Sequence, residues 1–248
     1  MIKIVIIDLD NTLTESRQKI SPEMAKAFEG LLEVKDVAII SGGTFPQIEF
    51  QVLSEISPDT NLDRLTLLPQ SGTSCLQNKD GKWEKIYSFE FDEKEKEQIY
   101  GALDNIYDIE PPESSTEPRV EDKGGQITYS PVGITSPPEM KAPYDPDHSK
   151  RKKIADALKE LLPDFEIGIG GLSSIDITRK GMNKSFGVSK IIEIKNVLPE
   201  EVIFIGDALW EGGNDAPACL PETQCIQVSG PDETRVVIKK IIEGKEMS

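Results

Sequence analysis

The chain has 248 residues, of which 37% are hydrophobic and 29% charged, a balance typical of a folded globular protein. Its net charge of −16 argues against nucleic acid and anionic membranes as partners, because both would repel it. A small phosphorylated substrate remains compatible with this charge, since a local cationic pocket can outweigh distant charges that salt screens.

Two further features indicate the cellular compartment. The N-terminal apolar run is too short for a signal peptide, and no stretch approaches the ~20 apolar residues of a membrane span. The three cysteines, Cys75, Cys219 and Cys225, are odd in number and lack metal-ligand spacing. We therefore expect a cytoplasmic protein whose thiols are reduced.

The first predicted strand, residues 4–7, ends in two carboxylates, Asp8 and Asp10. Four consecutive β-branched residues are typical of a strand buried on both faces of a parallel sheet. In an open α/β sheet, ligands bind beyond the carboxyl ends of the strands. Two carboxylates at this spacing point to the same side and repel each other unless a cation or a shared proton lies between them. A hard metal ion at this strand end is the simplest explanation.

Strands and helices alternate along the first third of the chain. A helix begins at Ser21-Pro22-Glu23, where the serine and the proline are typical of a helix start. The next strand, residues 37–40, ends in Ser41-Gly42-Gly43-Thr44. A helix through residues 48–56 and a strand at residues 65–68 follow. This alternation predicts parallel strands joined by right-handed crossovers.

The pattern changes after residue 76, where a hairpin turns at Asp80-Gly81. Helices and strands then follow in the order helix, two strands, helix, two strands, which is typical of an α+β domain. These elements are expected at residues 92–106, near 120, and at 127–130, 146–162, 165–169 and 173–178. We therefore expect an inserted α+β cap domain over residues 84–182.

From Lys184 the α/β alternation resumes. A strand at residues 202–205 runs into Gly206-Asp207, and a further strand and helix are expected at residues 224–228 and 232–242. The predicted fold class is thus α/β, with a Rossmann-like core built around a parallel sheet. Residues 1–83 and 183–248 form this core, and the cap interrupts it.

The carboxylates that follow the predicted core strands point to phosphoryl transfer. Asp8, Asp10 and Asp207 would meet at one edge of the sheet, and carboxylate and water oxygens are the ligands that Mg²⁺ prefers. In this interpretation Asp8 attacks a phosphate and forms an aspartyl-phosphate. Asp10 protonates the leaving oxygen and later deprotonates the incoming nucleophile.

Other residues at element boundaries complete the interpretation. Ser41, with the amides of Gly42 and Gly43, would donate hydrogen bonds to phosphate oxygens, and Lys184 would balance the charge of the transferring group. Each residue alone also has an ordinary explanation: an aspartate in a turn, a serine capping a helix, a lysine on the surface. Their occurrence together, in order and each at an element boundary, favours catalysis.

This ordered set resembles the haloacid dehalogenase-like superfamily of phosphotransferases. Residues 8–14 are similar to its first motif, residues 41–43 to its second, Lys184 to the lysine of its third, and residues 206–215 to its fourth. The insertion lies where members with a large α/β cap carry that cap. The resemblance implies an aspartyl-phosphate and Mg²⁺ held by acidic residues of the first and fourth motifs. These are Asp8, Asp10, Asp207 and Asp215.

The likeness narrows to the eukaryotic-type phosphomannomutases and their bacterial and archaeal relatives. Residues 170–176 are similar to the cap strand with which those enzymes contact the sugar, and residues 130–133 to another cap segment. The resemblance implies that Ser174 and Asp176 contact sugar hydroxyls and that the substrate is a small phosphorylated sugar. A homodimer is compatible with these expectations.

The cap departs from the family pattern at three positions. The mutases hold the distal phosphate of the substrate with arginines, and the matching positions here are Lys123, Ile134 and Lys141. A lysine holds phosphate only as a point charge, and an isoleucine cannot hold it. Because a mutase must hold both ends of a bisphosphate and a phosphatase only one, we expect a phosphatase of small phosphorylated sugars. The cations that could compensate are Arg119, Arg151 and Lys152.

Three alternative functions remain open. A hexose-phosphate mutase is the nearest. A glycosyltransferase would use the two aspartates of the first motif but would leave Lys184 and Asp207 without a role. A non-catalytic sugar-phosphate sensor would bind ligand without turnover. Two aromatic residues stay undecided, since Trp210 could line the entrance of the site or pack, and His148 is expected at a solvated helix start.

Overall fold

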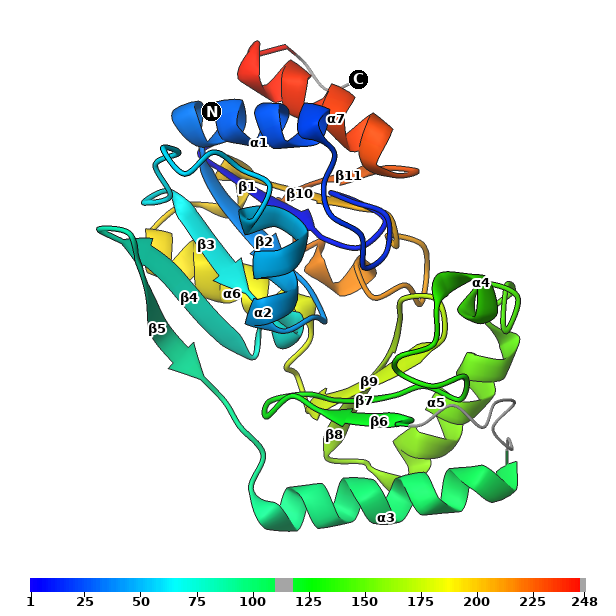
Figure 1. Cartoon of the computed structure of the whole chain (residues 1–248). Coiled ribbons are helices and arrows are strands. Elements are labelled where there is room, and N and C mark those ends of the chain that lie inside the picture. Colours follow the sequence, from blue (N-terminus) through cyan, green and yellow to red (C-terminus); the bar gives the residue numbers. More distant parts are fainter. Residues whose placement is uncertain (110–117, 246–248) are drawn as a thin grey trace.

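The computed structural model describes residues 1–109 and 118–245. Figure 1 shows two layered parts, one above the other, each built around its own β-sheet. The upper part contains both termini and a seven-stranded sheet, and the lower part contains a four-stranded sheet formed by the middle of the chain. This arrangement confirms the predicted α/β core with an inserted α+β cap.

The core sheet has the strand order β11-β10-β1-β2-β3-β4-β5. Its strands are β1 (Ile4–Asp8), β2 (Asp36–Ile40), β3 (Leu65–Leu68), β4 (Ser74–Lys79), β5 (Lys82–Ser88), β10 (Val202–Gly206) and β11 (Gln224–Gln227). The five strands from β11 to β3 are parallel, whereas the β4–β5 hairpin continues the sheet in antiparallel pairing. β1 therefore lies between β10 and β2, so the ends of these three strands meet at one edge.

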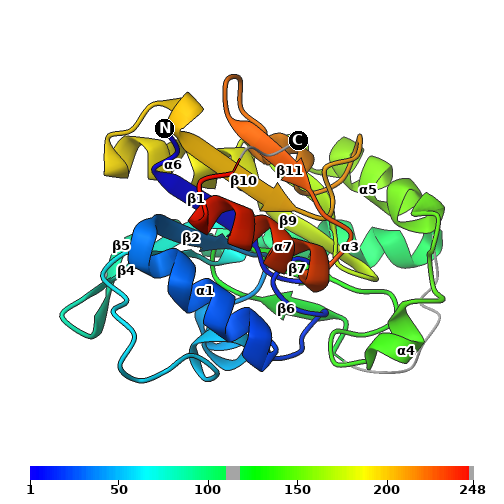
Figure 2. The ribbon, with the colours of Figure 1, turned by 90° about the horizontal axis from the view of Figure 1, so that it is seen from above.

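Helices cover both faces of this sheet because alternate residues of β1 point to opposite sides. Val5 and Ile7 pack with the helices α1 and α7, whereas Ile4 and Ile6 pack with α6 on the other face. Figure 2 shows α1 and α7 side by side along the sheet. The core helices and helical turns are α1 (Pro22–Val34), α2 (Phe45–Ile48), η1 (Glu49–Leu53), η2 (Gln70–Gly72), α6 (Lys184–Lys195), η3 (Pro199–Glu201), η4 (Ala216–Ala218) and α7 (Pro231–Ile242).

The cap has a four-stranded antiparallel sheet in the order β6-β7-β9-β8. Its elements are α3 (Glu93–Ile109), β6 (Val120–Asp122), β7 (Ile127–Tyr129), α4 (Pro138–Lys141), α5 (Ser149–Leu161), β8 (Phe165–Gly170) and β9 (Ser174–Arg179). Ile127, Tyr129, Ile175 and Ile177 pack with α3 and α5 on one face. The opposite face carries the alternate residues and lies toward the core (Figure 1).

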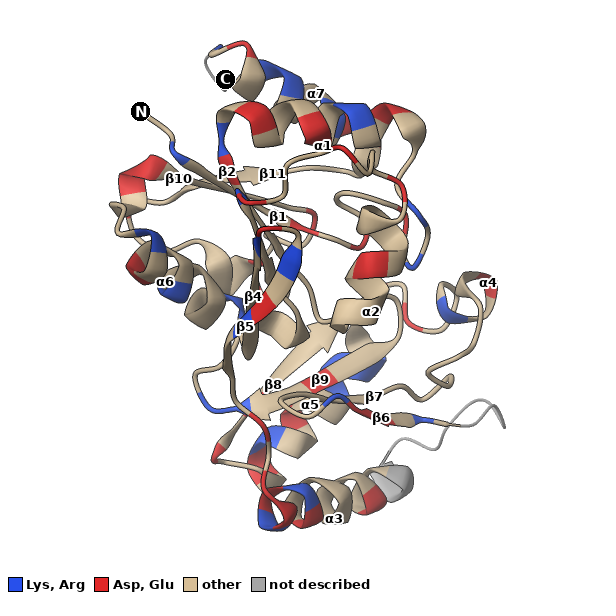
Figure 3. Cartoon of the chain, turned by 60° about the vertical axis from the view of Figure 1, so that its left-hand side comes forward, with Lys and Arg blue, Asp and Glu red and all other residues tan. Residues whose placement is uncertain are grey.

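The outer helices carry charged residues of both signs. Figure 3 shows acidic and basic positions along α1, α3 and α7. Among the helices that the structure describes, none combines the length and the apolar content needed to cross a membrane.

Two details of the core differ from the expected pattern. The expected helix over residues 48–56 is a short α2 that continues into the π-helical turn η1. The expected domain boundary between residues 83 and 84 falls inside β5, which pairs with β4 as far as Ser88. We therefore propose that the cap begins after Ser88.

The expectation of three reduced thiols is wrong for two of them. Cys219 and Cys225 form a disulfide, with Cα atoms 5.9 Å apart, because the chain turns back after η4 to begin β11. Cys75 is a free, buried thiol, and burial raises its pKa to about 12. The cysteines therefore no longer support the expected cytoplasmic location.

The packing of α1 gives a test of the core. Phe28 is fully buried in the cluster that α1 forms with the sheet and α7, whereas Val34 on the same helix is 45% exposed. We predict that Phe28→Ala lowers the free energy of unfolding by about 3–5 kcal/mol, since it removes apolar contacts and leaves a cavity. Val34→Ala should change it by less than about 0.5 kcal/mol. Urea denaturation followed by circular dichroism measures both, and equal losses would contradict this packing.

Candidate active site

Three carboxylates meet at the edge of the core sheet. Asp8 ends β1, Asp207 directly follows β10, and Asp215 lies at the end of the loop after β10. One carboxylate oxygen from each of them lies within 4.8 Å of the other two. Asp8 and Asp215 are buried, with 6% and 0% of their surface exposed. The fold therefore brings Asp8 from the start of the chain to the two acidic groups of the loop after β10.

Lys184 is the cation of this cluster. It is the first residue of α6, whose N-cap residue Asn183 accepts the Ser185 N–H. The Lys184 Nζ donates to the carboxylates of Asp8 and Asp215, at 2.5 Å each. Burial opposes the ammonium charge, but Asp215 and Asp8 outweigh this effect and hold the Lys184 pKa above its usual value. Lys184 is thus a fixed positive charge beside the expected nucleophile.

One lysine does not balance three carboxylates. Burial raises the pKa of Asp8 well above its usual value, and the neighbouring Asp215 and Asp207 raise it further, although Lys184 acts in the opposite direction. Burial and the Asp215 charge raise the pKa of Asp207 to about 6. A divalent cation among these oxygen donors would lower both pKa values and balance the charge. The residues present therefore fit a hard metal ion.

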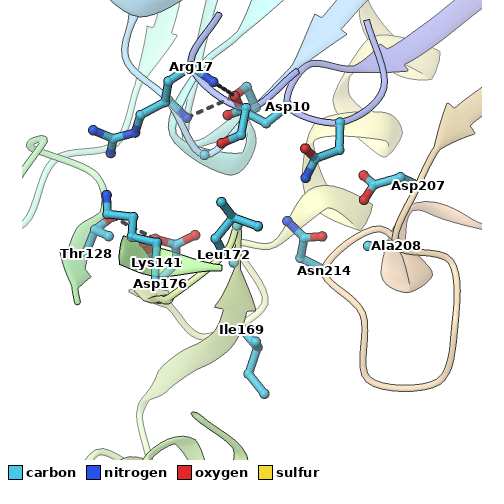
Figure 4. A pocket seen from close by; sticks show the side chains of 18 of the residues that line it. Asp10, Arg17, Thr128, Lys141, Ile169, Leu172, Asp176, Asp207, Ala208 and Asn214 are labelled. Carbon is cyan, nitrogen blue, oxygen red and sulfur yellow. Dashed lines mark hydrogen bonds between the residues drawn. The ribbon is translucent and has the colours of Figure 1, made fainter. Parts of the chain in front are cut away.

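The Asp10 carboxylate lies outside this group of three. It accepts the backbone N–H of Arg17 at 2.7 Å and the Gln51 Nε2 at 3.2 Å. Figure 4 shows Asp10 beside Arg17 and apart from Asp207. The position suits the expected acid–base role, whereas metal binding by the Asp10 carboxylate stays a prediction.

The loop after β2 carries Ser41, Gly42 and Gly43, as expected for a phosphate-binding segment. Ser41 is buried, and its Oγ accepts the Gly43 N–H at 3.0 Å. The Gly43 amide, which was expected to donate to phosphate, is therefore engaged within the loop. A Cβ at Gly43 would lie 2.9 Å from the Gln47 Oε1, so a larger residue there would displace the Gln47 side chain.

The cap approaches this loop with two side chains. The Lys123 Nζ and the Gln126 Nε2 both donate to the Gly42 carbonyl, at 2.8 and 3.1 Å. The Lys123 Nζ also donates to the Thr128 Oγ1 at 2.9 Å, and Thr128 donates to the Asp176 carboxylate at 2.7 Å. A chain of hydrogen bonds thus connects the expected phosphate loop to the expected sugar-binding strand.

A cavity of about 280 Å³ lies between the core edge and the cap sheet. Asp8, Ser41 and Asp207 line its core side, and Lys123, Lys141, Ser174 and Asp176 line its cap side. Figure 4 shows Thr128, Lys141 and Asp176 on one side and Asp207 with Asn214 on the other. Residues predicted from the first, second and fourth motifs and from the cap therefore border one space, and Lys184 lies behind Asp8.

The cations of the cap are held differently from one another. Lys141 is buried, and its Nζ donates to the Ile134 carbonyl at 2.7 Å. Burial, together with the charge of Arg17, lowers the Lys141 pKa to about 8. Arg17 donates to the same carbonyl at 3.0 Å. Position 134 thus contributes a carbonyl that holds two neighbouring cations.

Arg151, one of the cations considered as a replacement for the missing arginines, is already engaged within the cap. Its guanidinium pairs with the buried Asp145 at 2.8 Å and donates to the carbonyls of Gly170 and Gly171. It therefore fixes the turn between β8 and β9. Lys152 is exposed and pairs with Asp156.

Sequence reasoning missed Arg17, Gln126 and Thr128 as residues that line or shape the cavity. One signal for Thr128 was available, since its neighbours Ile127 and Tyr129 alternate with it as buried apolar residues, so Thr128 had to face the other way. Arg17 carried no such signal, because its position depends on the turn after Asp10.

Comparisons with known proteins agree with this geometry. Residues 24–244 match the family described as eukaryotic phosphomannomutase. The phosphomannomutase of Nicotiana benthamiana is 29% identical over 93% of this chain and 90% of its own length. That of Solanum lycopersicum is 27% identical over 98% and 95%, respectively.

Two solved structures share the fold. A Plasmodium falciparum IMP-nucleotidase aligns with a TM-score of 0.71 at 13% identity, over 98% of this chain and 68% of that one. A structure that reports a trigonal-bipyramidal intermediate in a phosphoryl-transfer superfamily aligns with a TM-score of 0.62 at 18% identity, over 98% and 99%.

The acidic cluster predicts that metal binding stabilises the protein. A ligand that binds only the folded state adds about 2.7 kcal/mol at 100 times its dissociation constant. We expect millimolar Mg²⁺ to raise the melting temperature of the wild type, and Asp207→Asn to remove most of this shift. Asp59→Asn, at an exposed position outside the cluster, should respond like the wild type. If Asp207→Asn responds like Asp59→Asn in differential scanning calorimetry, Asp207 is not a ligand.

Proposed function

Because the chain belongs to the eukaryotic phosphomannomutase family, we propose that it is a magnesium-dependent mutase of hexose phosphates. Its family and fold make it an enzyme of the haloacid dehalogenase-like phosphotransferase type. Which acceptor takes the phosphate is the proposed part. The changed cap cations favour water as the acceptor, whereas membership of this family favours a second hydroxyl of the sugar.

The distribution of charge along the cavity is the observation that carries this proposal. Lys184 is buried beside Asp8 without lining the cavity itself, whereas Arg17 from the core and Lys123 and Lys141 from the cap line it. A mutase must hold a hexose bisphosphate with one phosphate at each end, and three lining cations in addition to the lysine beside the nucleophile suit such a ligand. Hydrolysis of a monophosphate would require only the core end.

In the proposed reaction an oxygen of Asp8 attacks the phosphorus, and the bond to the sugar oxygen breaks as the aspartyl-phosphate forms. Asp10 gives its proton to the leaving sugar oxygen and later takes a proton from the hydroxyl that attacks the aspartyl-phosphate. The Arg17 N–H and the Gln51 side chain hold the Asp10 carboxylate in place for both steps. Lys184 stabilises the negative charge of the transferring group.

Magnesium, held by Asp8, Asp207 and Asp215, would supply the positive charge that the phosphate and the clustered carboxylates require. On the cap side, Asp176 is oriented by the Thr128 hydroxyl and would accept a hydrogen bond from a sugar hydroxyl. Ser174 lies two residues away on the same face of β9 and would contact a second hydroxyl. The cap would also exclude bulk water during transfer.

Hydrolysis remains the second candidate because of the cap itself. Ile134 carries no charge where the related mutases are expected to have an arginine, and the Lys123 ammonium is already engaged by the Gly42 carbonyl. Both features weaken the hold on a distal phosphate. A glycosyltransferase finds no support in the family, and a non-catalytic sensor would bind the same ligands without turnover.

Incubation with mannose 1-phosphate, Mg²⁺ and a hexose bisphosphate activator separates the two candidates. We expect isomerisation to mannose 6-phosphate to exceed release of inorganic phosphate, both followed by ³¹P NMR in the same sample. Phosphate release faster than isomerisation would defeat the mutase proposal and favour the phosphatase.

The nucleophile assignment has its own test. Asp8→Asn should lower turnover of mannose 1-phosphate by about 10⁴-fold or more, because removal of a nucleophile that forms a covalent intermediate has effects of this size. Asp59→Asn provides the matched control, with the same chemical change at an exposed position. Wild-type turnover by Asp8→Asn would show that another group attacks the phosphate.

Lys141 predicts a pH dependence of substrate binding. Its pKa of about 8 means that the ammonium is charged below pH 8 and neutral above it. Attraction to a phosphate is therefore present at pH 7 and declines toward pH 9, so the KM for the sugar phosphate should rise over this range. Lys141→Arg keeps its charge throughout, and its KM should stay constant. An equal rise in both proteins would assign the effect to another group.

A further inference from the structure

The cleft between core and cap contains a second, larger cavity. It measures about 730 Å³, against about 280 Å³ for the cavity that holds the candidate active site. His148 and Trp210 line both cavities. These two side chains therefore form part of the wall between the cavities.

The two rings are stacked on each other across the cleft. Their centroids are 4.6 Å apart and their planes differ by 16°. His148 comes from the cap, directly before α5, whereas Trp210 comes from the core loop that connects β10 to Asp215. The stack thus joins the two parts of the protein at the border of the active-site cavity.

The backbone on the cap side is arranged around this contact. His148 has a φ of 62°, in the left-handed region that residues other than glycine rarely adopt. Its side chain does not cap α5, since Asp145 accepts the N–H groups of Lys150 and Arg151, and Asp147 accepts that of Ser149. The imidazole is therefore free of the usual N-cap role and faces Trp210. Strained residues of this kind often lie at functional positions.

On the core side, the loop after β10 fixes the position of the indole. The Gly213 N–H donates to the Trp210 carbonyl at 2.9 Å, and the Asp215 N–H donates to the Ala208 carbonyl at 3.2 Å. A Cβ at Gly213 would lie 2.1 Å from the Ala208 carbonyl oxygen and 3.1 Å from the indole, so only glycine fits there. The loop that ends at Asp215 thus also fixes the Trp210 ring.

We infer that the His148–Trp210 stack limits the size of the phosphate esters that the active site accepts. The inference rests on the proposed function in so far as the smaller cavity is where a sugar phosphate binds. With the two rings stacked, the smaller cavity of about 280 Å³ suits a phosphorylated monosaccharide. An ester with a further ring, such as a nucleoside 5′-monophosphate, would need the space beyond the stack.

Binding of two probes tests this inference without turnover. In an Asp8→Asn background with Mg²⁺, we compare the dissociation constants of mannose 1-phosphate and adenosine 5′-monophosphate by calorimetry. We expect Trp210→Ala and His148→Asn each to shift the ratio of the two constants about tenfold toward the nucleotide, since apolar pockets discriminate by size to about this degree. Trp210→Phe, which keeps an aromatic ring, should shift it less.

The two rings should act as a unit. Once one ring is lost, loss of the other adds little, so the double variant should resemble the single variants. His148→Asn keeps a residue that tolerates the left-handed backbone, and it therefore tests the missing ring rather than the turn. An unchanged ratio in both single variants would overturn the inference.

Fluorescence provides a readout that is independent of ligands. The chain has two tryptophans, so a Trp83→Phe protein reports only Trp210. His148→Asn in this protein should change the intensity or the emission maximum of Trp210, because it removes the stacked imidazole. No change would mean that the stack does not form in solution and would overturn the inference. The wild type could fail to isomerise mannose 1-phosphate while the variants show the expected shifts in binding ratio and in fluorescence. That outcome would overturn only the proposed mutase function.

Discussion

The buried lysine at the edge of the core sheet is the interaction on which the site depends. Lys184 joins Asp8 at the end of β1 to Asp215 at the end of the loop after β10. Two buried carboxylates without this cation would repel each other and would be costly to desolvate. The third carboxylate, Asp207, leaves the cluster short of positive charge, and this deficit is what suits it to a metal ion and a phosphate.

The alternation of residues in the cap sheet completes the cavity. In its antiparallel sheet, alternate residues point to opposite faces, so the apolar side chains of β7 and β9 pack on α3 and α5. Thr128 and Asp176 necessarily face the core, where they border the cavity with Lys123 and Lys141. The same alternation that stabilises the cap therefore also supplies its polar contribution to the site.

Much of this could be read from the sequence because the signals are local. A run of β-branched residues predicts β1, and the acidic pair directly follows it in the sequence. Lys184 is expected at a helix start because the α/β alternation resumes there. The inserted cap could be predicted because the order of its helices and strands differs from that of the core. Arg17, by contrast, reaches the cavity through hydrogen bonds to Asp10 and Ile134, and no local pattern predicts them.

The sequence by itself therefore determined the α/β core, the inserted cap and the motifs that carry the acidic residues, the Ser41-Gly42-Gly43 loop and Lys184, since each depends on residues that are near neighbours in the chain. The tertiary structure decided which of them meet. It excluded the Asp10 carboxylate from the cluster of three, engaged Arg151 within the cap, and joined Cys219 to Cys225. It also stacked His148 on Trp210. These contacts link segments that only packing brings together, so periodicity and spacing could not reveal them.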